Sequence, residues 1–159
     1  MGHKARRGRP QASSPEALAR MKRQRQRDTK PEIAIRSELH RRGLRFRVDR
    51  KVLHGLRRKA DIVFVTASVA VFVDGCFWYG CPEHATWPKA NAQWWKDKIE
   101  ANRRRDADTK VRLTDAGWTV LRFWTHENPL DAAEKIEKVV SSRLKGGWSN
   151  GLFGDRTLN

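Results

Sequence analysis

The sequence predicts an α/β fold in which a small mixed β-sheet is flanked by helices. Segments with helical periodicity alternate along the chain with short segments rich in β-branched and aromatic residues. Two of these β-type segments are separated by only a Thr-Ala-Ser connection, which is typical of a hairpin. The length of 159 residues fits one compact domain with spare length at its ends.

The first predicted element is a helix that begins at residues 29–32, Thr-Lys-Pro-Glu. A Thr followed three residues later by Glu is the pattern of a capping box, and Pro is favoured in the first turn. The carboxylate of Glu32 either completes this capping box or reaches a functional site from the helix. Gly43 is suited to follow the end of the helix. The apolar residues of the helix are Ile33, Ile35 and Leu39.

Two strands are predicted next, at residues 60–65 and 69–74, because both segments are rich in Val, Ile and Phe. The short connection between them predicts an antiparallel hairpin. Residues 75–90 contain Gly, Cys, Pro, His and Trp and are predicted to form a constrained loop.

The second half of the chain is predicted to add a helix, a strand and a helix. The long helix covers residues 92–116 before Gly117, and a third buried strand covers residues 118–124. Asn128 and Pro129 open the last helix. Its apolar stripe is formed by Ala132, Ala133, Ile136, Val139, Val140 and Leu144.

The ends of the chain are predicted to be flexible. Residues 1–28 are rich in Arg, Lys, Gly, Pro and Ser, and form a basic arm with a short helix around residues 15–22. This arm either contacts phosphates weakly or serves only as a solubilising tail. The central domain is expected at residues 29–144, followed by a Gly-rich tail at residues 145–159.

The charge of the chain favours nucleic acid as a partner. There are 34 Lys and Arg residues against 18 Asp and Glu, a net charge of +16. Neutralising phosphates releases condensed counterions, so a basic domain gains affinity for nucleic acid. Seven tryptophans add aromatic surface that can stack on bases. The alternative is a highly charged surface that only keeps the protein in solution.

The apolar segments argue against a membrane or secreted protein. The longest, residues 62–73, is shorter than the ~20 residues of a membrane helix. The N-terminus lacks the apolar core of a signal peptide, and two cysteines are too few for a disulfide scaffold. We therefore expect a cytoplasmic protein.

Two aspartates on the predicted hairpin are candidate ligands for Mg²⁺. Asp61 lies at the start of one strand and Asp74 at the end of the next, so an antiparallel pairing brings them to the same end of the sheet. A carboxylate among Ile, Val and Phe is costly to bury unless it is neutralised, and Mg²⁺ prefers such oxygen ligands. The alternative is that both aspartates lie at solvated strand ends.

The long helix carries two polar residues on its predicted buried face. Trp95, Ile99 and Leu113 share one stripe with Asn102 and Asp106. Buried polar groups need partners. An active site is one explanation, and a salt bridge to one of the many arginines is the other.

A second candidate metal site lies in the constrained loop. Cys76, Cys81 and His84 stand within nine residues, and His126, just past the third predicted strand, is the best candidate for a fourth ligand. Two thiolates and two imidazoles form a closed tetrahedral site for structural Zn²⁺, chemically distinct from the carboxylate site. The alternative is a pair of reduced cysteines near unrelated histidines.

With these residues assembled, the chain closely resembles the very-short-patch-repair (Vsr) endonucleases. The matching segments run in order over about residues 18–144. They are Asp28-Thr29-Lys30-Pro31-Glu32, Ala60-Asp61-Ile62-Val63, Gly75-Cys76-Phe77-Trp78, Trp95-x2-Lys98-Ile99-x2-Asn102 with Asp106, and Gly117-Trp118-x-Val120-x3-Trp124. The resemblance implies a restriction-endonuclease-like fold. It also implies nicking on the 5′ side of the thymine in a T:G mismatch, the lesion left when 5-methylcytosine deaminates.

The resemblance implies catalytic roles for several residues. Asp61 is then the principal Mg²⁺ ligand, helped by the backbone carbonyl of Val73, and Glu32 supports catalysis. Asp74 and Tyr79 stand where the family usually has histidines, the second of which is its proton acceptor. Tyrosine, with a reference pKa of about 10, is a poor general base near neutrality. The expected consequence is that Asp74 and Asp106 share that work with Mg²⁺, or that cutting is slow or lost.

The same resemblance implies DNA contacts and zinc ligands. Three aromatic residues match those that the family inserts beside the mismatch: Phe77, Trp78 and Trp95. The alternative is that they only build the core. Lys98, Asn102 and Arg103 are expected to contact DNA. Cys76, Cys81 and His126 match zinc-ligand positions, and His84 substitutes for the remaining ligand.

The expected partner is double-stranded DNA with a mismatch, bound by a monomer at the nucleoid. The resemblance also suggests a functional link to a cytosine-5 DNA methyltransferase. Two other functions stay open at this point. One is a mismatch-binding module that no longer cuts, and the other is a restriction-type nuclease for modified DNA.

Overall fold

The computed structural model of the chain describes residue 15 and residues 28–84 and 89–149. The predicted helix around residues 15–22 and most of the predicted basic arm lie outside these described residues, as does the chain end after Ser149. Residues 145–149, predicted as the start of the tail, belong to the last helix.

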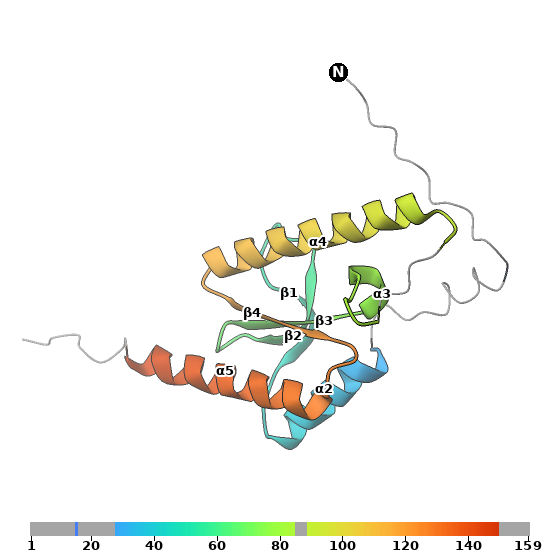
Figure 1. Cartoon of the computed structure of the whole chain (residues 1–159). Helices are drawn as coiled ribbons and strands as arrows, with labels where there is room; N and C mark the ends of the chain where they lie inside the picture. The colour runs from blue at the N-terminus through green and yellow to red at the C-terminus, as the bar shows by residue number, and fades with distance from the viewer. Residues whose placement is uncertain (1–14, 16–27, 85–88, 150–159) are drawn as a thin grey trace, which may run out of the picture.

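The described chain forms one mixed four-stranded sheet with helices on both faces, as predicted (Figure 1). The strands are β1 (Arg47–Lys51), β2 (Lys59–Phe64), β3 (Val69–Asp74) and β4 (Thr119–Trp124), in the order β1-β2-β3-β4. Strand β2 is antiparallel to both β1 and β3, and β4 runs parallel to β3. The predicted hairpin is therefore confirmed as β2 and β3.

The helices enclose the sheet from both sides. They are α2 (Lys30–Arg41), α3 (Cys76–Tyr79), α4 (Ala92–Asp115) and α5 (Pro129–Ser149). In Figure 1, α4 lies across one face of the sheet and α2 and α5 lie side by side under the other, while α3 lies beside the end of β3. Gly43 and Gly117 follow α2 and α4 with φ of +77° and +84°, a left-handed conformation that glycine adopts without steric cost.

Two apolar cores flank the sheet because alternate strand residues point to opposite faces. The core under α2 and α5 contains Ile35, Leu39, Ile62, Val69, Val71 and Ile136, among others. The core under α4 contains Leu56, Ala60, Val63, Ala70, Phe72 and Leu113. The buried stripe of α4 is confirmed, with Ile99, Asn102, Asp106 and Leu113 all buried, and Thr109 joins it.

Several details differ from the sequence prediction. Strand β1 was not predicted, because its residues Arg-Val-Asp-Arg-Lys lack an apolar pattern and its pairing with β2 supplies the order. Strand β4 is half-buried apart from Phe123, since it is an edge strand with a neighbour on one side only. Leu144 was expected on the apolar stripe of the last helix but is 41% exposed, and Ile33, one of the three apolar residues named for the first helix, is 49% exposed.

The register of the strands defines one end of the sheet that carries the candidate site. Lys51 at the end of β1 pairs with Lys59 at the start of β2, and Asp74 at the end of β3 pairs with Trp124 at the end of β4. We call this end the site end. No described helix combines the length and the apolar character needed to cross a membrane.

Candidate active site and metal centre

Asp61 is held at the site end by a backbone hydrogen bond. Ile62 and Val71 are the last paired residues of β2 and β3 toward the site end, so the Val73 amide lies beyond the paired part of these strands. This amide donates to Oδ2 of Asp61 at 2.7 Å. The side chain of Asp61 thus satisfies a backbone donor that the sheet does not use, which fixes the position of the carboxylate.

The environment of Asp61 disfavours its charge. Burial, together with the negative charges of Glu32 and Asp74, raises the pKa of Asp61 from 3.8 to about 6 against the opposing effect of the Val73 hydrogen bond. Within the described residues, no basic side chain forms an ion pair with Asp61. A half-buried carboxylate in this environment is stabilised by a cation placed against it.

Glu32 approaches Asp61 from the first turn of α2. Its side chain is 4% exposed, accepts a hydrogen bond from the Thr29 hydroxyl at 2.9 Å, and pairs with Arg36 at 3.1 Å. The predicted capping box is wrong, because Thr29 makes no side-chain bond to the helix backbone and its hydroxyl is used by the Glu32 carboxylate. The other alternative, that Glu32 reaches the site, agrees with its effect on the pKa of Asp61.

Asp74 and Asp106 are joined by Arg122. One Nη atom of Arg122 lies 3.3 Å from Asp74 and 2.9 Å from Asp106, and Arg58 also contacts Asp106. Burial raises the pKa of Asp74, although the positive charges of Arg122 and Arg58 oppose the shift. Of the two explanations for a buried Asp106, the salt bridge is the one the structure displays.

Arg58 and Arg122 were missed by the sequence analysis. Arg58 comes from an arginine-rich segment with nothing to single it out. Arg122, however, interrupts the apolar run of the predicted strand 118–124, and a charged residue inside such a strand requires a buried partner. That pattern could have paired it with one of the predicted acidic residues.

Tyr79 lies against the same arginine. The guanidinium carbon of Arg122 is 5.9 Å from the centre of the Tyr79 ring and 4.8 Å from that of Phe72. Burial raises the pKa of Tyr79 further above 10. The phenol is therefore protonated near neutrality, so Tyr79 can donate a hydrogen bond but does not accept a proton from water.

The predicted DNA-contact residues lie on α3 and on the first half of α4. Phe77 and Trp78 are the middle residues of α3. On α4, Trp95 is half-buried and packs edge-on against Trp94. Lys98 is also half-buried. Asn102 is buried and accepts a hydrogen bond from Arg105 at 2.6 Å.

Arg103, also predicted to contact DNA, has a different set of partners. Its guanidinium donates to the carbonyl oxygens of Tyr79 at 3.0 Å and Gly80 at 2.7 Å. These carbonyls lie at the C-terminal end of α3, where a helix has unsatisfied acceptors. Arg103 therefore ties α3 to α4. Gly80 has a φ of +61°, and a Cβ there would lie 2.9 Å from the Arg103 guanidinium.

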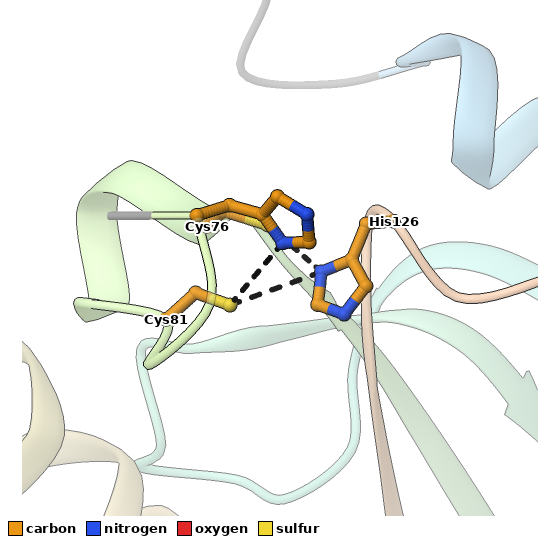
Figure 2. A group of neighbouring side chains, drawn as sticks. Cys76, Cys81 and His126 are labelled. Atoms are coloured by element: carbon orange, nitrogen blue, oxygen red, sulfur yellow. Dashed lines mark hydrogen bonds between the residues drawn. The ribbon is translucent and has the colours of Figure 1, made fainter. Parts of the chain in front are cut away.

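The four predicted zinc ligands converge in space. The ligand atoms of Cys76, Cys81, His84 and His126 all lie within 4.8 Å of one another. Nδ1 of His126 is 3.1 Å from the Cys76 sulfur and 3.8 Å from the Cys81 sulfur, and Nδ1 of His84 is 3.8 Å from the Cys81 sulfur. Figure 2 shows Cys76, Cys81 and His126 pointing toward one another from two separate segments.

This cluster fits a tetrahedral zinc ion. Zn–S and Zn–N bonds of their usual lengths separate the ligand atoms of one ion by about 3.3–3.8 Å, close to the distances above. Burial raises the pKa of the Cys81 thiol, but hydrogen bonds from the Glu83 backbone and His84 outweigh it and lower that pKa. The cluster is thus a candidate metal site that joins the end of α3 to the segment after β4.

Comparisons with known proteins agree with this arrangement. A family model described as DNA mismatch endonuclease Vsr matches residues 14–84. The type II nicking enzyme V.NaeI of Lentzea aerocolonigenes is 46% identical over 110 residues, which cover 68% of this chain and 66% of that protein. V.XorIIP of Xanthomonas oryzae pv. oryzae is 43% identical over 109 residues, covering 67% and 77%, and V.NmeDIP of Neisseria meningitidis serogroup C is 39% identical over 120 residues, covering 72% and 79%.

The chain thus spans about two thirds of the first relative and more than three quarters of the other two. All three relatives are named as nicking enzymes. The protein is a DNA endonuclease, that is, a hydrolase of phosphodiester bonds. It belongs to the Vsr family of DNA mismatch endonucleases.

Proposed function

We propose that this endonuclease requires Mg²⁺ and nicks duplex DNA on the 5′ side of the mispaired thymine in a T:G mismatch. Its task is then the repair of deaminated 5-methylcytosine. One observation carries the catalytic part of the proposal: Asp61 is a half-buried carboxylate beside the acidic Glu32 and Asp74, and it forms no ion pair with a basic side chain among the described residues, although the charge of Arg36 also acts on it. The mismatch part is supported by the description of the matching family, and the nicking part by the names of the relatives.

The residues around Asp61 fit a hard divalent cation. In an antiparallel pair, the N–H and C=O groups of one residue point to the same side of the strand. The amide of Val73 faces Asp61, so its carbonyl is on that side as well. Asp61 and the Val73 carbonyl are the proposed Mg²⁺ ligands, with Glu32 as a nearby second acid. Bound there, Mg²⁺ would polarise the scissile phosphate and lower the pKa of a water molecule.

Asp74 is the proposed proton acceptor. It lies at the end of β3, its negative charge acts on Asp61, and Arg122 holds it in place. Water then attacks the phosphorus in line and loses its proton to Asp74. The bond from phosphorus to the 3′ oxygen breaks and that oxygen takes up a proton from solvent, so the products are a 5′-phosphate and a 3′-hydroxyl. Tyr79 stays protonated and is proposed to donate to a phosphate oxygen. Asp106 positions Arg122 rather than taking part directly.

The Cys/His cluster is proposed to hold structural Zn²⁺ through Cys76, Cys81, His84 and His126. Because Cys76 begins α3 and Cys81 follows it, the ion would fix α3 and the backbone positions of the aromatic residues it carries. Phe77, Trp78 and Trp95 are the proposed wedge beside the mismatch, where a mispaired step is the cheapest to open. Lys98 and Asn102 are proposed DNA contacts.

The proposed catalytic unit covers residues 29–144 and acts as a monomer with the restriction-endonuclease-like fold. The basic segment before it is proposed to add phosphate contacts. A cytosine-5 DNA methyltransferase is the proposed functional partner, since it makes the base whose deamination creates the substrate.

A nicking assay on paired duplexes tests the substrate. With Mg²⁺ present, we expect a T:G duplex to be nicked on the T strand and the matched T:A duplex to stay intact, because only the mismatched step opens at low cost. A 5-methylcytosine duplex serves as the third substrate. Equal cutting of T:G and T:A would remove the mismatch claim, and preferential cutting of the methylated duplex would identify a restriction-type nuclease for modified DNA instead.

Replacement of Tyr79 tests the proton acceptor. A neutral phenol is not a base, so we expect Tyr79→Phe to keep the nicking rate within about fivefold, whereas Asp74→Asn lowers it at least about 100-fold. Single-turnover rates on the T:G duplex give both numbers.

The absence of a histidine at position 79 also favours a second function, a mismatch-binding protein that no longer cuts. In that case the wild-type protein binds the T:G duplex without nicking it, and the Tyr79→His variant gains nicking activity.

A further inference from the structure

The segment that contains β1 and its connection to β2 is strongly basic. Residues 45–59 contain seven Lys and Arg residues and one acid, Asp49. Two of these cations have acidic partners, since Arg58 contacts Asp106 and Lys59 lies 3.0 Å from Asp49. The other five are exposed and form no ion pair with any residue that the structure describes. Two of them, Arg45 and Arg47, lie toward the opposite end of β1. The remaining three are Arg50, Lys51 and Arg57, which we call the hairpin cations after the antiparallel pair of β1 and β2.

The strand register places the hairpin cations at the site end. Arg50 pairs with Ala60, directly before Asp61, and Lys51 pairs with Lys59. Arg57 precedes Arg58, whose side chain reaches the network of Asp106 and Arg122 beside Asp74. The positive charges therefore lie next to the strand that carries the catalytic carboxylate.

Their arrangement favours an external anion. Like charges directly opposite each other on paired strands destabilise a sheet, and Lys51 and Lys59 are such a pair. Protection of an exposed edge strand against aggregation is another use of such charges. That use explains Arg50 and Lys51 on β1 but not Arg57, which lies in the connection and not on the edge strand.

We propose that the hairpin cations bind backbone phosphates of the DNA that flank the scissile position, without reading sequence. The inference rests on the proposed function at Asp61. In the sheet, β2 lies between β1 and β3, and α3 follows β3 (Figure 1). DNA that crosses the site end then meets the aromatic residues of α3 on one side of Asp61 and the hairpin cations on the other. Such contacts position the duplex and carry affinity but no base specificity.

The salt dependence of DNA binding tests this surface. The test variant is Arg50→Gln/Lys51→Gln/Arg57→Gln, and binding to T:G and T:A duplexes is measured without Mg²⁺ between 50 and 200 mM KCl. Each phosphate contact contributes about 0.9 to the slope of log K against log salt, so we expect the slope to become shallower by about 2 to 3. Affinities for the two duplexes should fall by the same factor, which leaves their ratio unchanged.

A matched control removes the same charge elsewhere. Lys110 lies near the C-terminal end of α4, and Lys138 and Lys145 lie along α5. In that region, Arg143 of α5 donates to the carbonyls of Ala67 and Gly117, at the end of the sheet opposite to the site end. Lys110→Gln/Lys138→Gln/Lys145→Gln should change the slope by less than 1. Arg50→Lys/Arg57→Lys should keep the wild-type slope, because a phosphate contact requires charge rather than a guanidinium.

Several outcomes would overturn the inference. They are an unchanged slope in the test variant, an equal change in the matched control, and a loss confined to the T:G duplex, which would indicate a base contact. A test variant that aggregates while its soluble fraction binds DNA with the wild-type slope would assign the charges to edge protection. Since these measurements require binding and no cutting, they stay interpretable if the protein fails to nick, and circular dichroism verifies that each variant is folded.

Discussion

Replacing Asp61 with asparagine is expected to lower the nicking rate at least about 1,000-fold, with binding to the T:G duplex changed only a few-fold. The proposed metal is worth several kcal/mol of transition-state stabilisation, and each 1.36 kcal/mol corresponds to a factor of ten. Asparagine keeps the shape of the side chain but offers the cation no charge. Single-turnover nicking and equilibrium binding on the same duplex separate the two effects.

Asp108→Asn is the matched control. Asp108 is an exposed residue of α4 that pairs with Arg112, so the same chemical change there should leave both nicking and binding at wild-type levels. If Asp61→Asn still nicks within tenfold of the wild type, the carboxylate is not the metal ligand and the hydrolytic mechanism proposed here is wrong.

The same variant also has an expected effect on stability. A pKa raised from 3.8 to about 6 means that the folded chain holds the proton more tightly than the unfolded chain, so ionisation costs stability as the pH rises from about 4 to about 6. The full cost is about 3 kcal/mol. In zinc-loaded protein without Mg²⁺, Asp61→Asn should therefore become more stable than the wild type as the pH rises toward 7. Urea denaturation between pH 5 and 7.5 measures this, and a pH-independent difference would contradict it.

Removing a zinc ligand is expected to have the second large effect. Cys81 is 2% exposed, and its sulfur lies 3.8 Å from Nδ1 of both His84 and His126, a separation that suits two ligands of one zinc ion. We expect Cys81→Ala to lose the bound zinc and at least about 10 °C of Tm, because the free energy of metal binding contributes directly to folding. Native mass spectrometry counts zinc ions per chain, and calorimetry gives the Tm.

Two further variants make this result decisive. His84→Cys offers another good zinc ligand at the same place and should retain one ion per chain. His54→Ala changes an exposed histidine outside the cluster and should alter neither the zinc content nor the Tm. A wild-type protein without zinc, or a Cys81→Ala variant that still binds one ion, would show that the cluster is not a zinc site.

Much of the fold could be read from local patterns. The hairpin of β2 and β3 follows from two β-type runs and a short connection, and the buried stripe of α4 follows from helical spacing. Gly43 and Gly117 mark helix ends because their positive φ suits glycine. The Cys/His cluster was also predicted, since three of its four members lie within nine residues. Apart from the contribution of His126 to that cluster, the deciding interactions are between residues close in the sequence.

Only the tertiary structure decided the remaining features. Strand β1 has no apolar alternation, and its place depends on pairing with β2. The partners of Asp106 could not be chosen from the sequence, because Arg58 lies in the connection before β2, Arg122 lies on β4, and many other arginines were equally available. The same holds for Arg103, whose acceptors are backbone carbonyls more than twenty residues away. Local sequence determines which elements form and which side chains carry the chemistry, whereas the choice among chemically equivalent partners is made by the packing of those elements.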